Sequence, residues 1–276
     1  MSRVGVIAGR WPRPLSGRAS RRALVAVLAL LFAGSSALTV VWGTSMSAMH
    51  AMPMHGGSAM SMTSTGMCGL TWAGAAASFV AMWTGMMAAM MLPSLAPTLW
   101  HYHRALEGMG APRPGRRAML AGTGYFVVWT AIGMAVFPLG SALAAAGAWL
   151  PAWASAGPLM VGVVVLGTGV FQLTAWKAHH LARCREASAP GRSMPADAAA
   201  AWRHGLRLGI HCSQSCVGLT ATVLALGVMD LRAMAVVTAA ITAERLAPDG
   251  ARVARAIGTV AVGAGLLLLA RAIGVA

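Results

Sequence analysis

Acidic residues are scarce in this chain, which has only 6 Asp and Glu among 276 residues, and those few are scattered along it. The sequence also lacks a P-loop, a dinucleotide-binding glycine fingerprint, an HExxH motif and a Ser/His/Asp set. It therefore gives no support for ATP-driven transport by this chain alone, and we do not expect the protein to be an enzyme.

Charge of either sign is rare as well, at 10% of the residues, whereas 58% of the residues are hydrophobic. Several apolar runs approach or exceed the roughly 20 residues that a helix needs to cross a bilayer. The 33 glycines are typical of helices that pack closely within a membrane. We therefore predict an all-α, polytopic transmembrane helical bundle of about seven spans, or six if the first is a cleaved signal. The expected spans are residues 23–43, 71–99, 118–142, 157–176, 208–229, 233–246 and 256–274.

The formal net charge of +15 is concentrated at the expected membrane edges. With the N terminus inside, the internal segments collect nearly all the basic residues, and only Arg232 and Arg271 fall outside, as the positive-inside rule predicts. This pattern indicates a multi-pass protein of the bacterial inner (cytoplasmic) membrane with a cytoplasmic N terminus. The basic charge is then a topology signal at the lipid bilayer, and no nucleic-acid partner is expected.

The beginning of the chain allows two interpretations. Arg21 and Arg22 precede a short apolar core, as in a twin-arginine or secretory signal, and cleavage near Ser36 or Ala37 would then remove the first span. The apolar stretch continues to Trp42, which favours a retained helix. The chain divides into a basic N-terminal segment with the first helix (1–43), an external Met/His-rich loop (44–70), a transmembrane core (71–246) and a C-terminal transmembrane helix (247–276).

The expected external loop is rich in methionine. Between residues 46 and 68 it carries seven Met, two His and no charged residue, and its Gly, Pro, Ser and Thr content disfavours a helix. Thioether sulfur prefers Cu(I), and neutral imidazole accepts Cu(I) or Cu(II), so this composition indicates copper capture. A low-complexity loop without metal is the alternative. The candidate ligands are Met46, Met49, His50, Met52, Met54 and His55.

A second methionine cluster lies within the apolar segment 71–99. Met86 and Met90 are four residues apart and share one helical face, and Met87 and Met91 form an adjacent row. Two or three sulfur atoms are therefore expected to point at one copper site, with the packing of flexible side chains as the alternative. The two prolines that follow predict a kink in this helix.

The cysteines form the third candidate site. Cys212 and Cys216 are four residues apart in an expected span, so they lie on one helical face, with His211 beside them. Cys184 is expected in the preceding loop on the inner side. Cytoplasmic thiols stay reduced and suit Cu(I) or zinc, although packing and a redox dithiol are alternatives. Glu244 is expected to snorkel with Arg245 at the inner membrane edge, with neutralisation of a passing cation as the alternative.

Three sequence blocks resemble the signature blocks of the DUF2182 family, described as predicted metal-binding integral membrane proteins and sometimes as copper chaperones. The blocks are MMAAMMLPSLAP (86–97), FQLTAWKAHHLARCR (171–185) and GLRLGIHCSQSCVGLTATVLALGVMD (205–230). The resemblance covers residues 71–246. This chain departs from the family at Ser215, where a third cysteine is common, and at Ala175, where proline is common. The resemblance implies roles for Met86, Met87, Met90, Met91, Pro93, Gln172, Lys177, Cys184, Cys212 and Cys216.

These observations lead to one main hypothesis. The chain is an integral membrane protein that binds copper, as Cu(I) rather than zinc, for delivery, tolerance or assembly of a copper enzyme. A periplasmic or membrane copper protein is the expected partner, and the oligomeric state stays open. The alternatives are a structural or assembly subunit without metal and a membrane dithiol that exchanges electrons with a partner.

Overall fold

The structure is a computed structural model that describes residues 16–50, 71–149, 157–188, 197–228 and 230–274. All regular structure within these ranges is α-helical, which confirms the predicted all-α class. The helices are α1 (Ser16–His50), α2 (Trp72–Gly108), α3 (Pro114–Trp149), α5 (Gly157–Gln172), α6 (Ala175–Ser188), α7 (Ala198–Leu226), α8 (Leu231–Leu246) and α9 (Gly250–Ala272).

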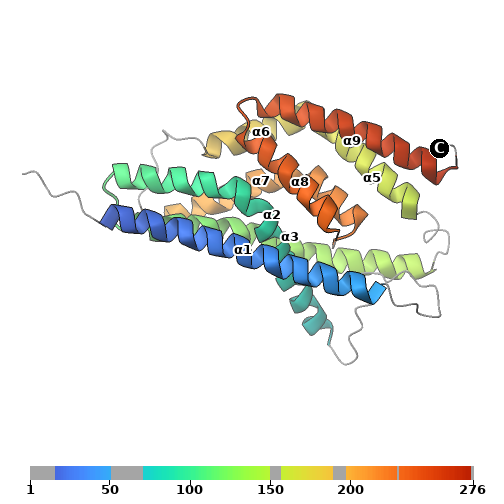
Figure 1. Ribbon diagram of the computed structural model, residues 1–276, viewed down its shortest axis with the longest axis horizontal. Helices are drawn as coiled ribbons and strands as arrows, with labels where there is room; N and C mark the ends of the chain where they lie inside the picture. Colours follow the sequence, from blue (N-terminus) through green and yellow to red (C-terminus); the bar gives the residue numbers. More distant parts are fainter. Residues whose placement is uncertain (1–15, 51–70, 150–156, 189–196, 229, 275–276) are drawn as a thin grey trace, which may run out of the picture.

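The helices form an elongated bundle (Figure 1). Helix α5 lies along α9, α1 lies along α2, and α7 packs against α3, α5, α6 and α8. Helix α2 also packs against α3 and α8. Segments that are distant in sequence therefore meet around α7, and the centre described below lies there.

The three aspartates begin helices. Asp197 accepts a hydrogen bond from the backbone N–H of the third residue of α7, and Asp230 and Asp249 act in the same way at the starts of α8 and α9. A carboxylate at this position stabilises a helix by about 1 kcal/mol. Half of the scarce acidic residues thus have a structural role.

Two helix pairs approach closely where glycine faces a neighbouring backbone. A Cβ atom at Gly205 on α7 would collide with the carbonyl oxygen of Ala121 on α3. A Cβ atom at Gly169 on α5 would collide with the backbone nitrogen of Val262 on α9. The close helix packing expected from the glycine content is present at both places.

The number of helices able to cross a membrane is smaller than expected. By length and composition, α1, α2, α3, α7 and α9 qualify, and α5 with α6 adds at most one more span, because the two are bent by 68° at their break. The expected span at 233–246 is wrong. Helix α8 has only 16 residues, about 24 Å of length, and it buries Glu244 and Arg245 in its last turn. Within the described ranges, the expected seven spans are therefore five or six.

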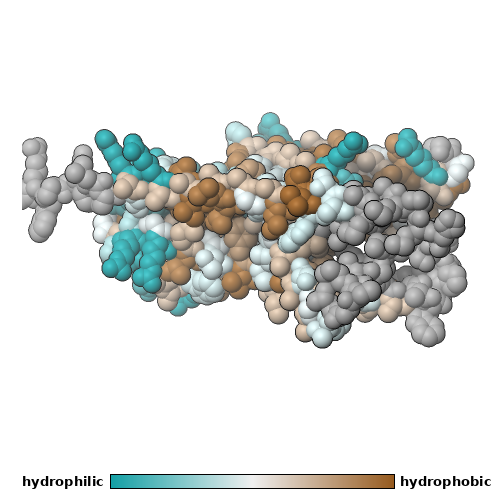
Figure 2. All heavy atoms as spheres, turned by 60° about the horizontal axis from the view of Figure 1, so that its bottom comes forward, coloured by the Kyte–Doolittle hydropathy of each residue, from teal (hydrophilic) through white to brown (hydrophobic). Residues whose placement is uncertain are grey.

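The outer surface of the bundle is largely apolar. Leu30, Val236 and Val260 are 72%, 69% and 73% exposed. Figure 2 shows apolar residues along the middle of one face, a large hydrophilic group at the end where α1 begins and smaller hydrophilic groups along the upper edge. This distribution is compatible with a multi-pass membrane protein, whereas the choice of membrane and the side of the N terminus stay predictions.

Helix α1 is longer than its expected span, since it continues to His50. Residues 44–50 contain neither glycine nor proline, so nothing in them interrupts the helix. Met46, Met49 and His50 therefore belong to a helix, and their expected place in a loop is wrong. The other residues proposed for the external site, Met52, Met54 and His55, lie outside the described residues.

Candidate metal centre

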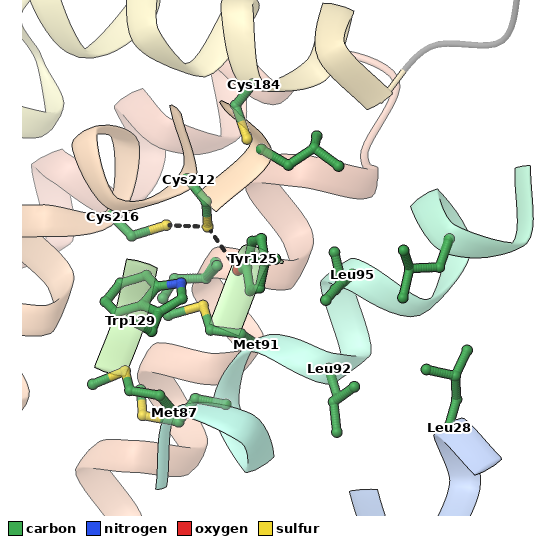
Figure 3. Packing of buried hydrophobic residues seen from close by; sticks show 14 of the residues in the cluster. Leu28, Met87, Met91, Leu92, Leu95, Tyr125, Trp129, Cys184, Cys212 and Cys216 are labelled. Carbon is green, nitrogen blue, oxygen red and sulfur yellow. Dashed lines mark hydrogen bonds between the residues drawn. The ribbon is translucent and has the colours of Figure 1, made fainter. Parts of the chain in front are cut away.

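Three cysteine side chains come together in the core (Figure 3). Cys212 and Cys216, one turn apart on α7, are buried with their Sγ atoms 3.8 Å apart. Cys184 reaches the same place from α6 and contacts Cys212. The expectation that Cys184 lies in a loop is wrong, because residues Ala175–Ser188 are helical. The fold thus adds a third thiol to the pair that the sequence spacing predicts.

A hydroxyl and a guanidinium contact the sulfur of Cys212. Tyr125 on α3 donates a hydrogen bond from its hydroxyl to Cys212 Sγ at 3.0 Å. Arg245 on α8 donates from Nη1 to Cys212 Sγ at 3.5 Å and to Ser94 Oγ at 2.9 Å. Ser94 in turn donates to the carbonyl oxygen of Met91 at 3.0 Å, so Arg245 connects the methionine helix with the thiol helix. Both donors can also form hydrogen bonds to a thiolate, which is the form of cysteine that binds metals.

A buried ion pair lies beside the thiols. Lys177 on α6 and Glu244 on α8 are 0% and 1% exposed, and their Nζ and Oε2 atoms are 2.7 Å apart. Lys177 also donates to the carbonyl oxygen of Ser215 on α7, and Gln172 on α5 donates to the other carboxylate oxygen of Glu244. The expected snorkelling of Glu244 is wrong, because these partners hold it inside the bundle.

The methionine cluster of α2 faces the same core. Met86, Met87, Met90 and Met91 are each at most 2% exposed and belong to one cluster of buried side chains with the three cysteines. Figure 3 shows Met87 and Met91 near Trp129, below the thiols in that view. Figure 1 also shows that α2 bends, as its two internal prolines predict. The sulfur atoms of this cluster therefore lie in the interior and not at the outer surface.

His211 has other neighbours. It precedes Cys212, and consecutive residues of a helix point about 100° apart. On the side of α6, His180 approaches both His211 and Gln214. His180 therefore lies on the same side as His211, and the role of His211 as a ligand beside Cys212 stays a prediction.

Across the described ranges, no three or more His, Cys, Asp and Glu side chains are arranged to hold a metal ion. The pair on α7 offers two thiols, and the methionines of α2 offer thioether sulfur. A metal centre here would therefore rely on the two thiols of α7 with support from methionine.

Sequence reasoning missed Tyr125, Ser94 and the position of Arg245. Spacing along the chain does not distinguish Tyr125 from an aromatic residue that only packs. A signal for Arg245 was present, since a charged residue in an apolar stretch usually faces the bundle interior and a partner there. The same signal applies to Lys177, whose partner lies on another helix.

The fold and this centre define a class of protein: a bundle of apolar, membrane-length helices that encloses a group of soft sulfur atoms. The sequence model of the PpoB2 family, described as copper chaperone, matches residues 80–268, and the chain therefore belongs to this copper-chaperone family. The match extends past the expected core of 71–246 into α9. The DUF2182 name stays a prediction. No curated protein and no solved structure matches the chain.

Proposed function

We propose that this protein holds Cu(I) inside a membrane-spanning bundle and passes it to a copper-requiring partner. The observation that carries the proposal is the pair of buried thiols, Cys212 and Cys216, with sulfur atoms 3.8 Å apart. They lie in a core that also contains the methionine cluster of α2. Membership of a copper-chaperone family supports copper as the cargo.

The types of donor favour Cu(I) over other metals. Thiolate and thioether sulfur are soft ligands that select Cu(I), whereas Mg²⁺ and Ca²⁺ require several oxygen ligands. Structural zinc sites use four strong ligands, and the buried carboxylate of Glu244 already pairs with Lys177. Two thiolates with weak thioether support therefore suit Cu(I) better than zinc.

The methionines would provide the exchangeable ligands in this proposal. A thioether binds without losing a proton, whereas each thiol releases a proton when it binds a metal, so the thiols hold the ion more tightly and in a pH-dependent way. The Met- and His-rich segment 46–68 would capture copper, and α2 would connect it with the thiols. The acceptor would be a copper protein in the periplasm or in the bacterial inner membrane.

Metal content of the full chain, purified in detergent under reducing conditions, tests the thiol site. We expect about one tightly bound Cu(I) per wild-type chain, and none in Cys212→Ser/Cys216→Ser, because both thiolates are lost. The matched control is Ser213→Ala/Val217→Ala, which changes two residues with the same spacing on another side of α7. This control should retain copper. Retention of copper by Cys212→Ser/Cys216→Ser as well would show that the thiols are not ligands.

The same measurement with competing chelators tests the methionines. Met87→Leu/Met91→Leu should lower the Cu(I) affinity about tenfold, because two weak soft ligands are replaced by apolar side chains of similar size. The control is Met134→Leu/Met160→Leu, since these two methionines are exposed. An equal effect of both changes would assign the methionines of α2 to packing.

Failure of folded wild-type protein to bind Cu(I) would refute the proposal. The alternatives would then be a membrane dithiol that exchanges electrons and a structural or assembly subunit without metal. A disulfide bond is about 2.05 Å long, so the two sulfur atoms of α7, which are 3.8 Å apart, would have to move closer together to form one. A reversible disulfide in a redox titration would then support the dithiol role. Absence of both copper and a disulfide would support a structural or assembly subunit.

A further inference from the structure

We propose that Arg245 makes the thiol centre selective for a monovalent metal ion, because its charge neutralises the complex that two thiolates form with such an ion. The inference rests on the proposed copper-binding function and adds to it. Arg245 is not a ligand in this proposal. It sets the net charge of the buried centre and thereby the class of ion that the centre accepts.

Three buried charged side chains among the described residues lie around the centre: Lys177, Glu244 and Arg245. Lys177 and Glu244 neutralise each other at 2.7 Å. In the described part of the chain Arg245 forms no ion pair with a carboxylate, and its Nη1 donates to Ser94 and Cys212. Its Nη2 is buried without a hydrogen-bond partner in the described part of the chain. The centre therefore carries one uncompensated positive charge beside the sulfur of Cys212.

Burial makes this charge effective. The Arg245 side chain lies in the interior, at 8% exposed, where solvent screens charges less than it does at a surface. A buried cation without a counter-ion is costly, and such a group in a bundle interior normally has a partner. Here the neighbouring groups that can supply negative charge are the thiols.

The charge balance differs between monovalent and divalent ions. Two thiolates and Cu(I) form a complex of charge −1, which Arg245 brings to zero. Two thiolates and Zn²⁺ form a neutral complex, and Arg245 then leaves a buried charge of +1. In both cases the two thiols release two protons to solvent, and no electron is transferred. Because a net charge in the interior is unfavourable, Arg245 stabilises the first complex and destabilises the second.

Cys184, the third thiol, fits the same charge balance when it is protonated and therefore neutral. If Cys184 also bound as a thiolate, the cuprous complex with Arg245 would again carry −1. A divalent ion, in contrast, would need this third thiolate to reach neutrality. Cys184 therefore contacts Cys212 as a neutral thiol when Cu(I) is bound.

Two substitutions of Arg245 in the full-length, detergent-solubilised protein separate charge from hydrogen bonding. We would measure dissociation constants for Cu(I) and Zn²⁺ by competition with chromogenic chelators. Arg245→Gln keeps a donor but removes the charge, and it should weaken Cu(I) binding about 100-fold while Zn²⁺ binding stays the same or tightens. Arg245→Lys keeps the charge and should retain the preference for Cu(I).

Two further variants serve as controls. Arg252→Gln removes a charge from a side chain that is 80% exposed and pairs with Asp249, and it should change neither affinity. Tyr125→Phe removes the neutral donor to Cys212 Sγ, and it should weaken both metals by similar factors. A change in the ratio of the two affinities is therefore specific to the buried charge.

A variant on another residue keeps the proposal falsifiable if Arg245→Gln does not fold. Glu244→Gln is nearly isosteric, and its amide oxygen still accepts from Lys177, but it adds one net positive charge to the centre. The preference for Cu(I) over Zn²⁺ should then rise. An unchanged or lower ratio in Glu244→Gln, or equal losses of both metals in folded Arg245→Gln, would overturn the inference. Loss of Cu(I) binding by the wild type, in contrast, would overturn the proposed function itself.

Discussion

The contact between α5 and α9 and the centre around α7 hold their helices together in different ways. Glycines of α5 and α9 face the partner helix so closely that a Cβ atom would collide with it. The centre around α7 instead buries large and polar side chains, among them Tyr125, Lys177 and Arg245. The close backbone contact between α5 and α9 leaves no space for a ligand. The centre around α7 offers a ligand sulfur atoms, hydrogen-bond donors and charged groups. Both regions lie within the family match, and they differ in the groups that their contacts offer to a ligand.

The largest effect on stability is expected from a substitution that removes one partner of the buried ion pair at the centre. Lys177→Met leaves Glu244 buried without its cation, and we expect a loss of about 3–5 kcal/mol in the free energy of unfolding. The double change Lys177→Met/Glu244→Gln should recover most of this loss, because no unpaired charge remains. Thermal or denaturant unfolding in detergent measures both variants. A single variant as stable as the double variant would contradict the role of the ion pair.

A substitution at the contact between α5 and α9 should have a smaller effect on stability. Gly169→Val forces a side chain against the backbone of α9, and we expect it to destabilise the fold by about 1–3 kcal/mol. The Cu(I) affinity of the folded fraction should not change, since α9 is not part of the centre. Gly167→Val is the matched control on α5, because no neighbouring atom lies within 4 Å of a Cβ there. Loss of copper in Gly169→Val alone would mean that the two regions are coupled.

The smallest effect is expected at the edge of the bundle. Arg21 on α1 and Glu107 on α2 form an ion pair of 2.7 Å, and the Arg21 side chain is 42% exposed. Glu107→Gln should therefore cost less than about 1 kcal/mol, and added salt should reduce the difference from the wild type. Unfolding at low and high salt measures it. A loss as large as that of Lys177→Met would show that partly exposed and buried pairs are equivalent here.

Local patterns along the sequence predict much of the fold and part of the site. Apolar runs give the all-α class, and the four-residue spacing of Cys212 and Cys216 places them on one face of a helix. The third thiol was not predictable from spacing, because Cys184 reaches the centre through a helix bent away from α5. The burial of Glu244 was missed for a similar reason, since Lys177 and Gln172 come from distant parts of the chain.

The bend between α5 and α6 has a consequence for how the third thiol is aligned. Lys177 and Cys184 are seven residues apart on α6, about two helical turns, so they point in the same direction. A shift of α6 by one residue would rotate both side chains by about 100° and withdraw them from α7 and α8 together. The ion pair between Lys177 and Glu244 therefore fixes the register of α6, and with it the distance between Cys184 and Cys212.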